Sequence, residues 1–141
     1  MRKSRWPSAK NDHDFDRYLR GTPEGSIRLF QRFVSMARAA GRVTFELQRH
    51  SVVLCGSRRI FASVAPTEQG IEGILNLPRR LTDRRIYRSE PLTKRIVLHR
   101  YLVRCAEDLD SDFAAWLEEG LAIGNGEPIQ PSSRLDSSPT G

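Results

Sequence analysis

Apolar residues recur with a helical period in two long segments of the chain. From residue 22 to residue 40 they lie three and four positions apart, which is typical of an amphipathic helix. Thr22-Pro23-Glu24 opens this segment with a cap, a first-turn proline and an acidic side chain, and Gly41 ends it. A second long helix is predicted over residues 106–122, with acidic side chains at its start, and a short one over residues 12–19.

Between the two long helices the apolar pattern changes to that of β-strands. Val43, Phe45 and Leu47 alternate with polar residues, which predicts a half-buried strand. Further apolar runs bounded by turn residues predict four more strands, over residues 51–55, 60–65, 71–77 and 96–103. Short turns favour an antiparallel meander in which the last strand is central. The predicted fold class is therefore α+β: an antiparallel sheet of about five strands, flanked by an N-terminal helical pair and a C-terminal helix.

The chain of 141 residues is long enough for one domain with a real core, and all the predicted elements fall within residues 12–123. Residues 1–11 are polar and basic, and residues 124–141 are rich in proline and serine. Neither terminal segment has much apolar surface to bury, so both are predicted to be disordered.

Several features of the sequence predict a cytoplasmic protein without a membrane association. No apolar run approaches the roughly 18 residues that span a bilayer, and no apolar stretch follows the basic start as in a secretory signal. Cys55 and Cys105 have neither zinc-site nor disulfide-framework spacing. They are expected to be reduced thiols.

Charge is distributed unevenly along the chain. The net charge is +6 overall, but residues 79–104 carry +7 and residues 105–141 carry −7. The basic segment follows the strand over residues 71–77 and contains five closely spaced arginines: Arg79, Arg80, Arg84, Arg85 and Arg88. Guanidinium groups pair well with phosphates and carboxylates, so this segment is the candidate anion-binding site. Internal pairing with the acidic C-terminal region is the competing interpretation.

Three other side chains could complete such a site. Tyr87 and Tyr101 are candidates for stacking on bases. His99 lies within a predicted strand, where it is either a ligand contact or a hydrogen-bonded structural residue.

The run Leu77-Pro78-Arg79-Arg80-Leu81, followed by Ala106-Glu107-Asp108-Leu109-Asp110 and Trp116-Leu117, resembles the uncharacterised bacterial domain-of-unknown-function family 5655. The helix start Gly21-Thr22-Pro23-Glu24 and the strand around Ile60-Phe61-Ala62 fit the same order of elements, so the resemblance covers residues 15–123. The chain departs from the family pattern at Ile96-Val97 and in having no second histidine beside His99. The resemblance implies a compact α+β domain with no established activity, and it transfers no catalytic residue.

No motif for a metal, a cofactor or catalysis is evident. Asp108, Asp110, Asp112 and Glu119 have the spacing of a calcium loop, but Phe113 occupies the position that requires glycine. The chain also lacks glycine-rich phosphate loops and a serine-hydrolase motif. No catalytic residue, cofactor or metal site is therefore predicted.

The sequence favours a non-enzymatic binding module. Its arginine-rich connection and the adjacent open sheet face would bind an anionic partner, either nucleic acid or an acidic protein. The alternative is a protein–protein interaction module, such as a homodimer, because the strands over residues 60–65 and 96–103 are apolar on both faces. An enzyme with a small-molecule pocket around His99 and Cys55 is the third hypothesis.

Overall fold

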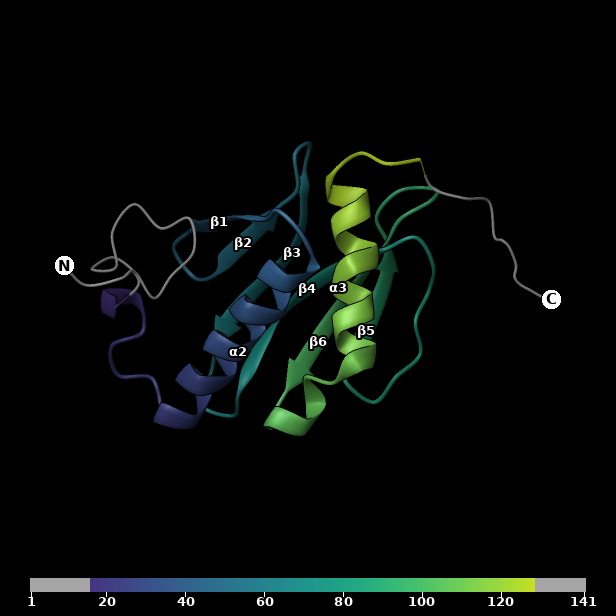
Figure 1. Cartoon of the computed structure of the whole chain (residues 1–141). Coiled ribbons are helices and arrows are strands. Elements are labelled where there is room, and N and C mark those ends of the chain that lie inside the picture. The colour runs from purple at the N-terminus through teal and green to yellow at the C-terminus, as the bar shows by residue number, and fades with distance from the viewer. Residues whose placement is uncertain (1–15, 129–141) are drawn as a thin grey trace.

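The computed structural model describes residues 16–128 and contains one six-stranded antiparallel sheet. The strand order is β1-β2-β3-β4-β6-β5, and α2 and α3 lie on the same face of the sheet (Figure 1). The predicted α+β class is confirmed. The elements are α2 (Glu24–Ala40), β1 (Thr44–Leu47), β2 (Val52–Cys55), β3 (Ile60–Pro66), β4 (Ile71–Leu77), β5 (Ile86–Pro91), β6 (Val97–Val103), the short 3₁₀ helix η1 (Ala106–Asp108) and α3 (Ser111–Gly124).

The sheet has one strand more than expected, and it is not a simple meander. The additional strand, β5, lies inside the arginine-rich connection and pairs with β6 at the edge of the sheet. Its sequence does not alternate between apolar and polar residues, because an edge strand buries little of either face. As expected for a central strand, β6 lies between two neighbours. They are β4 and the additional strand β5, which forms the edge of the sheet.

The helix boundaries differ from the predicted ones at several points. The segment over residues 106–122 is not one helix, because Asp110 caps α3 by accepting a hydrogen bond from the Phe113 N–H at 3.0 Å. Pro23, rather than Thr22, is the N-terminal cap of α2, since its ψ of 144° is not helical. No helix within residues 16–128 is both long and apolar enough to span a bilayer.

Three predictions concern residues outside the described range. Of the short helix expected over residues 12–19, only residues 16–19 are described; residues 16–18 are helical and Leu19 lies in the turn that follows. The predicted disorder of residues 1–11 lies wholly outside the description. That of residues 124–141 lies outside it from residue 129, while α3 continues to Gly124.

The core lies between the helices and the sheet, with Tyr101 at its centre. The Tyr101 ring stacks on Phe33 of α2 at a centroid distance of 5.9 Å and meets Phe113 of α3 edge-on at 5.4 Å. In the β4–β6 register Tyr101 lies opposite Gly73. A Cβ atom at residue 73 would collide with the Ser63 carbonyl and the Tyr101 hydroxyl, so the absence of a side chain makes room for the phenol.

The Tyr101 hydroxyl also interrupts the β3–β4 ladder. It donates a hydrogen bond of 2.6 Å to the Ser63 carbonyl, while the Ile74 N–H donates to the Ser63 hydroxyl at 3.1 Å. Two side-chain hydroxyls therefore satisfy backbone groups that a regular ladder would pair with each other.

The arginine-rich connection crosses the helix-covered face of the sheet. Strands β4 and β5 are both antiparallel to β6, so they run in the same direction, and the chain must return along the sheet between them. It does so beside α3, as the contacts of Arg79 with Glu119 and of Arg85 with Asp110 show. In Figure 1 the connection descends on the α3 side of the sheet. This segment thus covers a part of the sheet that a third helix would otherwise cover.

Replacing Tyr101 with phenylalanine should destabilise the protein by about 1–3 kcal/mol, because the buried Ser63 carbonyl loses its hydrogen-bond donor. Urea unfolding monitored by circular dichroism measures the difference. Tyr87, which is 60% exposed, supplies the matched control: Tyr87→Phe should change the free energy of unfolding by less than about 0.5 kcal/mol. Equal effects of the two substitutions would contradict the role of the Tyr101 hydroxyl.

Candidate anion-binding surface

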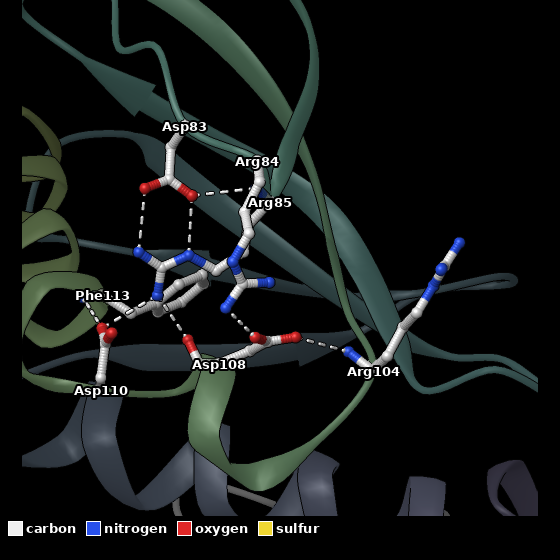
Figure 2. A network of polar contacts seen from close by, with 7 residues as sticks. All are labelled: Asp83, Arg84, Arg85, Arg104, Asp108, Asp110 and Phe113. Carbon is white, nitrogen blue, oxygen red and sulfur yellow. Dashed lines mark hydrogen bonds and ion pairs between the residues drawn. The ribbon is translucent and has the colours of Figure 1, made fainter.

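Arg85 is the most deeply buried of the five predicted arginines, with 5% of its surface exposed. Its Nε and one terminal nitrogen donate to the two carboxylate oxygens of Asp83 at 2.8 and 3.0 Å (Figure 2). The other terminal nitrogen donates to the Asp108 carbonyl at 2.7 Å and to Asp110 at 2.9 Å. The guanidinium also lies 4.5 Å from the centroid of the Trp116 ring. All three guanidinium nitrogens are engaged internally, so Arg85 is a structural residue rather than a binding residue.

The same contacts keep the acidic side chains ionised. The hydrogen bond from Arg85 lowers the pKa of Asp83, and the Phe113 N–H and then Arg85 lower the pKa of Asp110. Burial opposes ionisation of Asp108, but the Arg84 guanidinium and the Arg104 N–H together with weaker contacts outweigh it, and the pKa of Asp108 is lowered too. The cluster is therefore fully charged at neutral pH.

The other arginines of the segment are more exposed. Arg84 donates to Asp108 at 2.6 Å, although 72% of its side chain remains exposed. Arg79 forms a bidentate pair with Glu119 of α3. Arg88 contacts Glu90, and Arg80 has no ion pair or side-chain hydrogen bond within the described range. Pairing with the acidic C-terminal region, the competing interpretation, thus holds for Arg79, Arg84 and Arg85, while Arg88 pairs within its own strand.

His99 and Tyr101 are fully buried on the helix-covered face and cannot touch an external ligand. The Leu81 N–H donates to His99 Nε2 at 2.9 Å, so the ring proton is on Nδ1, which lies 3.2 Å from the Leu75 carbonyl. Burial lowers the pKa of His99, which is therefore neutral. Tyr101 is a core residue and not a base-stacking platform.

The small-molecule pocket hypothesised around His99 and Cys55 does not form. Strands β3 and β4 separate the two residues in the sheet, and Cys55 lies on the opposite face, beside Glu46. Burial, followed by the nearby Glu46 charge, raises the pKa of the Cys55 thiol, which makes it less reactive. Residues 16–128 contain no group of three acidic, histidine or cysteine side chains that could hold a metal ion.

Two further arginines without ion pairs in the described part of the chain lie at the other face of the sheet. Along β6, His99 and Tyr101 point toward the helices, and alternation turns Arg100 to the opposite face, where its register partner is Arg88 of β5. Arg104 follows in the same alternation. Its guanidinium, like that of Arg100, makes no ion pair within residues 16–128, and Figure 2 shows its side chain extending away from the Arg85 network.

We define the open-face site as two adjoining hollows on this side of the sheet. The smaller, of about 180 Å³, is lined by His50, Ile74 and Arg100, among others. The larger, of about 580 Å³, is lined by Arg84, Arg85, Leu102, Arg104 and Asp108. Glu72 and Tyr87 line both hollows, which makes them one continuous surface.

Two of the four arginines around the open-face site were not identified from the sequence. Arg84 and Arg88 belong to the predicted segment, whereas Arg100 and Arg104 belong to β6 and its end. The sequence signal that could have revealed them is alternation along β6. Leu98, Arg100, Leu102 and Arg104 alternate with the buried residues His99, Tyr101 and Val103. Leu98 and Leu102 are apolar, so the sequence pattern predicts a strand that is apolar on both faces.

Comparison with known proteins finds no matching family model, no matching curated protein and no matching solved structure. The resemblance to domain-of-unknown-function family 5655 therefore stays a prediction. Function has to be argued from the open-face site itself.

Arg85→Lys should lower the free energy of unfolding by about 3 kcal/mol or more, because an ammonium cannot reproduce the paired contacts of a buried guanidinium. Arg88→Lys, at a pair whose arginine side chain is 68% exposed, is the matched control and should cost less than about 1 kcal/mol. Urea denaturation of both variants tests this. If Arg88→Lys cost as much as Arg85→Lys, the Arg85 network would not be a main source of stability.

The protein should become less stable as the pH falls below about 6.5. The pKa of His99 is lower in the folded state than in the unfolded chain, so the unfolded chain binds the extra proton first as the pH falls. Urea unfolding at pH 7.5 and at pH 5.5, two conditions on either side of about 6.5, measures the change. His99→Gln should remove most of this dependence, whereas His50→Gln, at an exposed position, should keep it. An unaltered dependence in His99→Gln would contradict the assignment.

Proposed function

We propose that this protein is a non-enzymatic module that binds single-stranded nucleic acid on the open face of its sheet. The observation that carries the proposal is that the exposed Tyr87 lines both hollows, together with Arg100 in the smaller one and Arg84 and Arg104 in the larger one, while Arg88 is the register partner of Arg100. Guanidinium groups bind backbone phosphates, and an exposed aromatic ring stacks on any base.

The shape of the open-face site favours a single strand over a duplex. A hollow of about 180 Å³ beside the Tyr87 ring offers space to a base that is turned out of its strand. A duplex keeps its bases stacked inside and would leave this hollow empty. The larger hollow, with Arg84 and Arg104 on its walls, then receives the neighbouring phosphates.

Self-association is a second candidate, supported by a different part of the same face. Ile60, which pairs with Cys55 in the register, is 42% exposed, and Leu98 is half-buried. These apolar side chains lie outside both hollows. Light scattering over a range of concentrations distinguishes the candidates, because only self-association predicts a mass that rises with protein concentration.

Fluorescence anisotropy with labelled single-stranded oligonucleotides at several salt concentrations tests the proposal. Arg100→Ala should weaken binding and reduce the slope of log affinity against log salt by about 0.7, the contribution of one phosphate contact. Tyr87→Ala should weaken binding by about 1–3 kcal/mol through lost stacking and leave the slope unchanged. Arg38→Ala, at an exposed position on α2, is the matched control and should change neither quantity.

Three results would count against single-strand binding. One is no binding even at low salt, and another is an equal loss in Arg38→Ala and Arg100→Ala. The third is tighter binding of a matched duplex. A labelled polyglutamate peptide is included because an acidic protein is the other anionic partner: if the peptide binds and the oligonucleotide does not, the partner is acidic protein.

A further inference from the structure

We infer that the protein has a second binding site, for a small phosphorylated organic molecule, on the side of the sheet that carries the helices. The site is a hollow of about 690 Å³ between the start of α2, the turn from β3 to β4 and the chain that follows β6. This volume lies within the range of about 300–1,000 Å³ that is usual for small-molecule sites. It is larger than either hollow of the open-face site, which does not include it.

The walls of this hollow are tied to one another. The buried Ser26 hydroxyl of α2 donates a hydrogen bond of 2.6 Å to the Thr67 carbonyl in the β3–β4 turn. The Thr67 hydroxyl oxygen in turn accepts from the Gln69 and Gly70 N–H groups, each at 3.1 Å. The backbone of Gly70 lies so close to the Val103 carbonyl at the end of β6 that no side chain would fit there. The hollow therefore exists before a ligand arrives, which reduces the ordering cost of binding.

The charges around the hollow favour an anion. Arg28 and Arg32 of α2 line it, Arg104 borders it at the end of β6, where its side chain turns toward the open face, and Glu68 is the one acidic residue among its lining residues. Arg32 and Arg104 make no ion pair within residues 16–128, while Arg28 contacts Glu24 only at 3.8 Å, between side chains that are 70% and 72% exposed. An excess of positive charge in guanidinium form suits a doubly charged phosphate, which accepts paired hydrogen bonds.

The apolar part of the lining indicates that the ligand is larger than inorganic phosphate. Leu29, which is 7% exposed, contributes to the wall together with Pro23 and Ala106. A phosphate alone would leave this surface in water, whereas an organic group attached to the phosphate would cover it. The ligand class is thus a small phosphate ester.

Arg32 separates this site from the open-face site. Arg104 lines both, but Arg32 is on α2 and lines only the hollow beside the helix. Loss of single-strand binding on substitution of Arg100 and loss of phosphate-ester binding on substitution of Arg32 are therefore independent results. Either proposal can fail without the other.

Cys105 provides a direct reporter, because it is exposed and lines the hollow. The full chain has two cysteines, so Cys55→Ser leaves a single thiol. The experiment measures the rate of its alkylation by iodoacetamide with and without adenosine monophosphate, glucose 6-phosphate and glycerol 3-phosphate. Adenosine, glucose, glycerol and inorganic phosphate are the matched controls. We expect at least one ester to slow alkylation at concentrations where its unphosphorylated counterpart and inorganic phosphate do not.

Substitutions in the same Cys55→Ser background assign the effect to the hollow. Arg32→Ala should lower the affinity for the protecting ester about tenfold or more, since it removes a charged hydrogen-bond donor. Arg38→Ala, six residues further along the same helix and outside the hollow, should leave protection unchanged. The inference is overturned if no ester protects, if inorganic phosphate protects equally well, or if the two substitutions have the same effect. Isothermal titration calorimetry with the protecting ester, on wild-type protein, supplies a readout that is independent of the thiol.

Discussion

The buried guanidinium of Arg85 is the interaction on which the rest of this structure most depends. The return from β4 to β5 is a long irregular segment with few apolar residues, so hydrophobic burial alone would hold it weakly against the sheet. Arg85 holds this segment in place through two sets of contacts. One is with Asp83 in the connection itself, and the other is with Asp110 and the Asp108 carbonyl at the start of α3. A buried charge of this kind is stable only because every guanidinium nitrogen has a partner. The position of β5, and with it that of Tyr87 and Arg88, follows from this anchoring.

One strand then divides core from surface. On β6, His99, Tyr101 and Val103 complete the interior, and the residues between them reach the uncovered face. Arg84 and Arg85 show the same division at adjacent positions, since one side chain is mostly exposed and the other is buried. The open-face site is therefore built on the reverse side of the best-packed part of the molecule, where its side chains have rigid backbone support.

Sequence periodicity was sufficient for the long helices and for the strands that bury one or two apolar faces. It failed at β5, because Ile-Tyr-Arg-Ser-Glu-Pro has no periodic signal and its pairing with β6 is a tertiary fact. The arginine segment was located correctly, but the sequence could not decide which of its members were available. Arg79 pairs with Glu119 of α3, 40 residues further along the chain, and Arg85 pairs with Asp110, the cap of α3, 25 residues further along. Only folding brings these residues together. The candidate stacking role of Tyr101 is wrong, and of the two alternatives for His99 the structure has the hydrogen-bonded structural residue. The sequence could not decide either point, because a strand with apolar residues on both sides does not reveal which side meets the helices.

The glycine at position 73 and the tyrosine at position 101 have a consequence for how this chain can diverge. The Ser63 carbonyl and the Tyr101 hydroxyl together occupy the space that a side chain at position 73 would need, and the hydroxyl replaces a missing ladder contact of β3. Position 73 is therefore restricted to glycine even if the tyrosine is lost, because the Ser63 backbone alone would clash with a side chain there. Loss of the tyrosine would leave a gap above the glycine, so residue 101 is constrained by a glycine that lies 28 positions away in the chain.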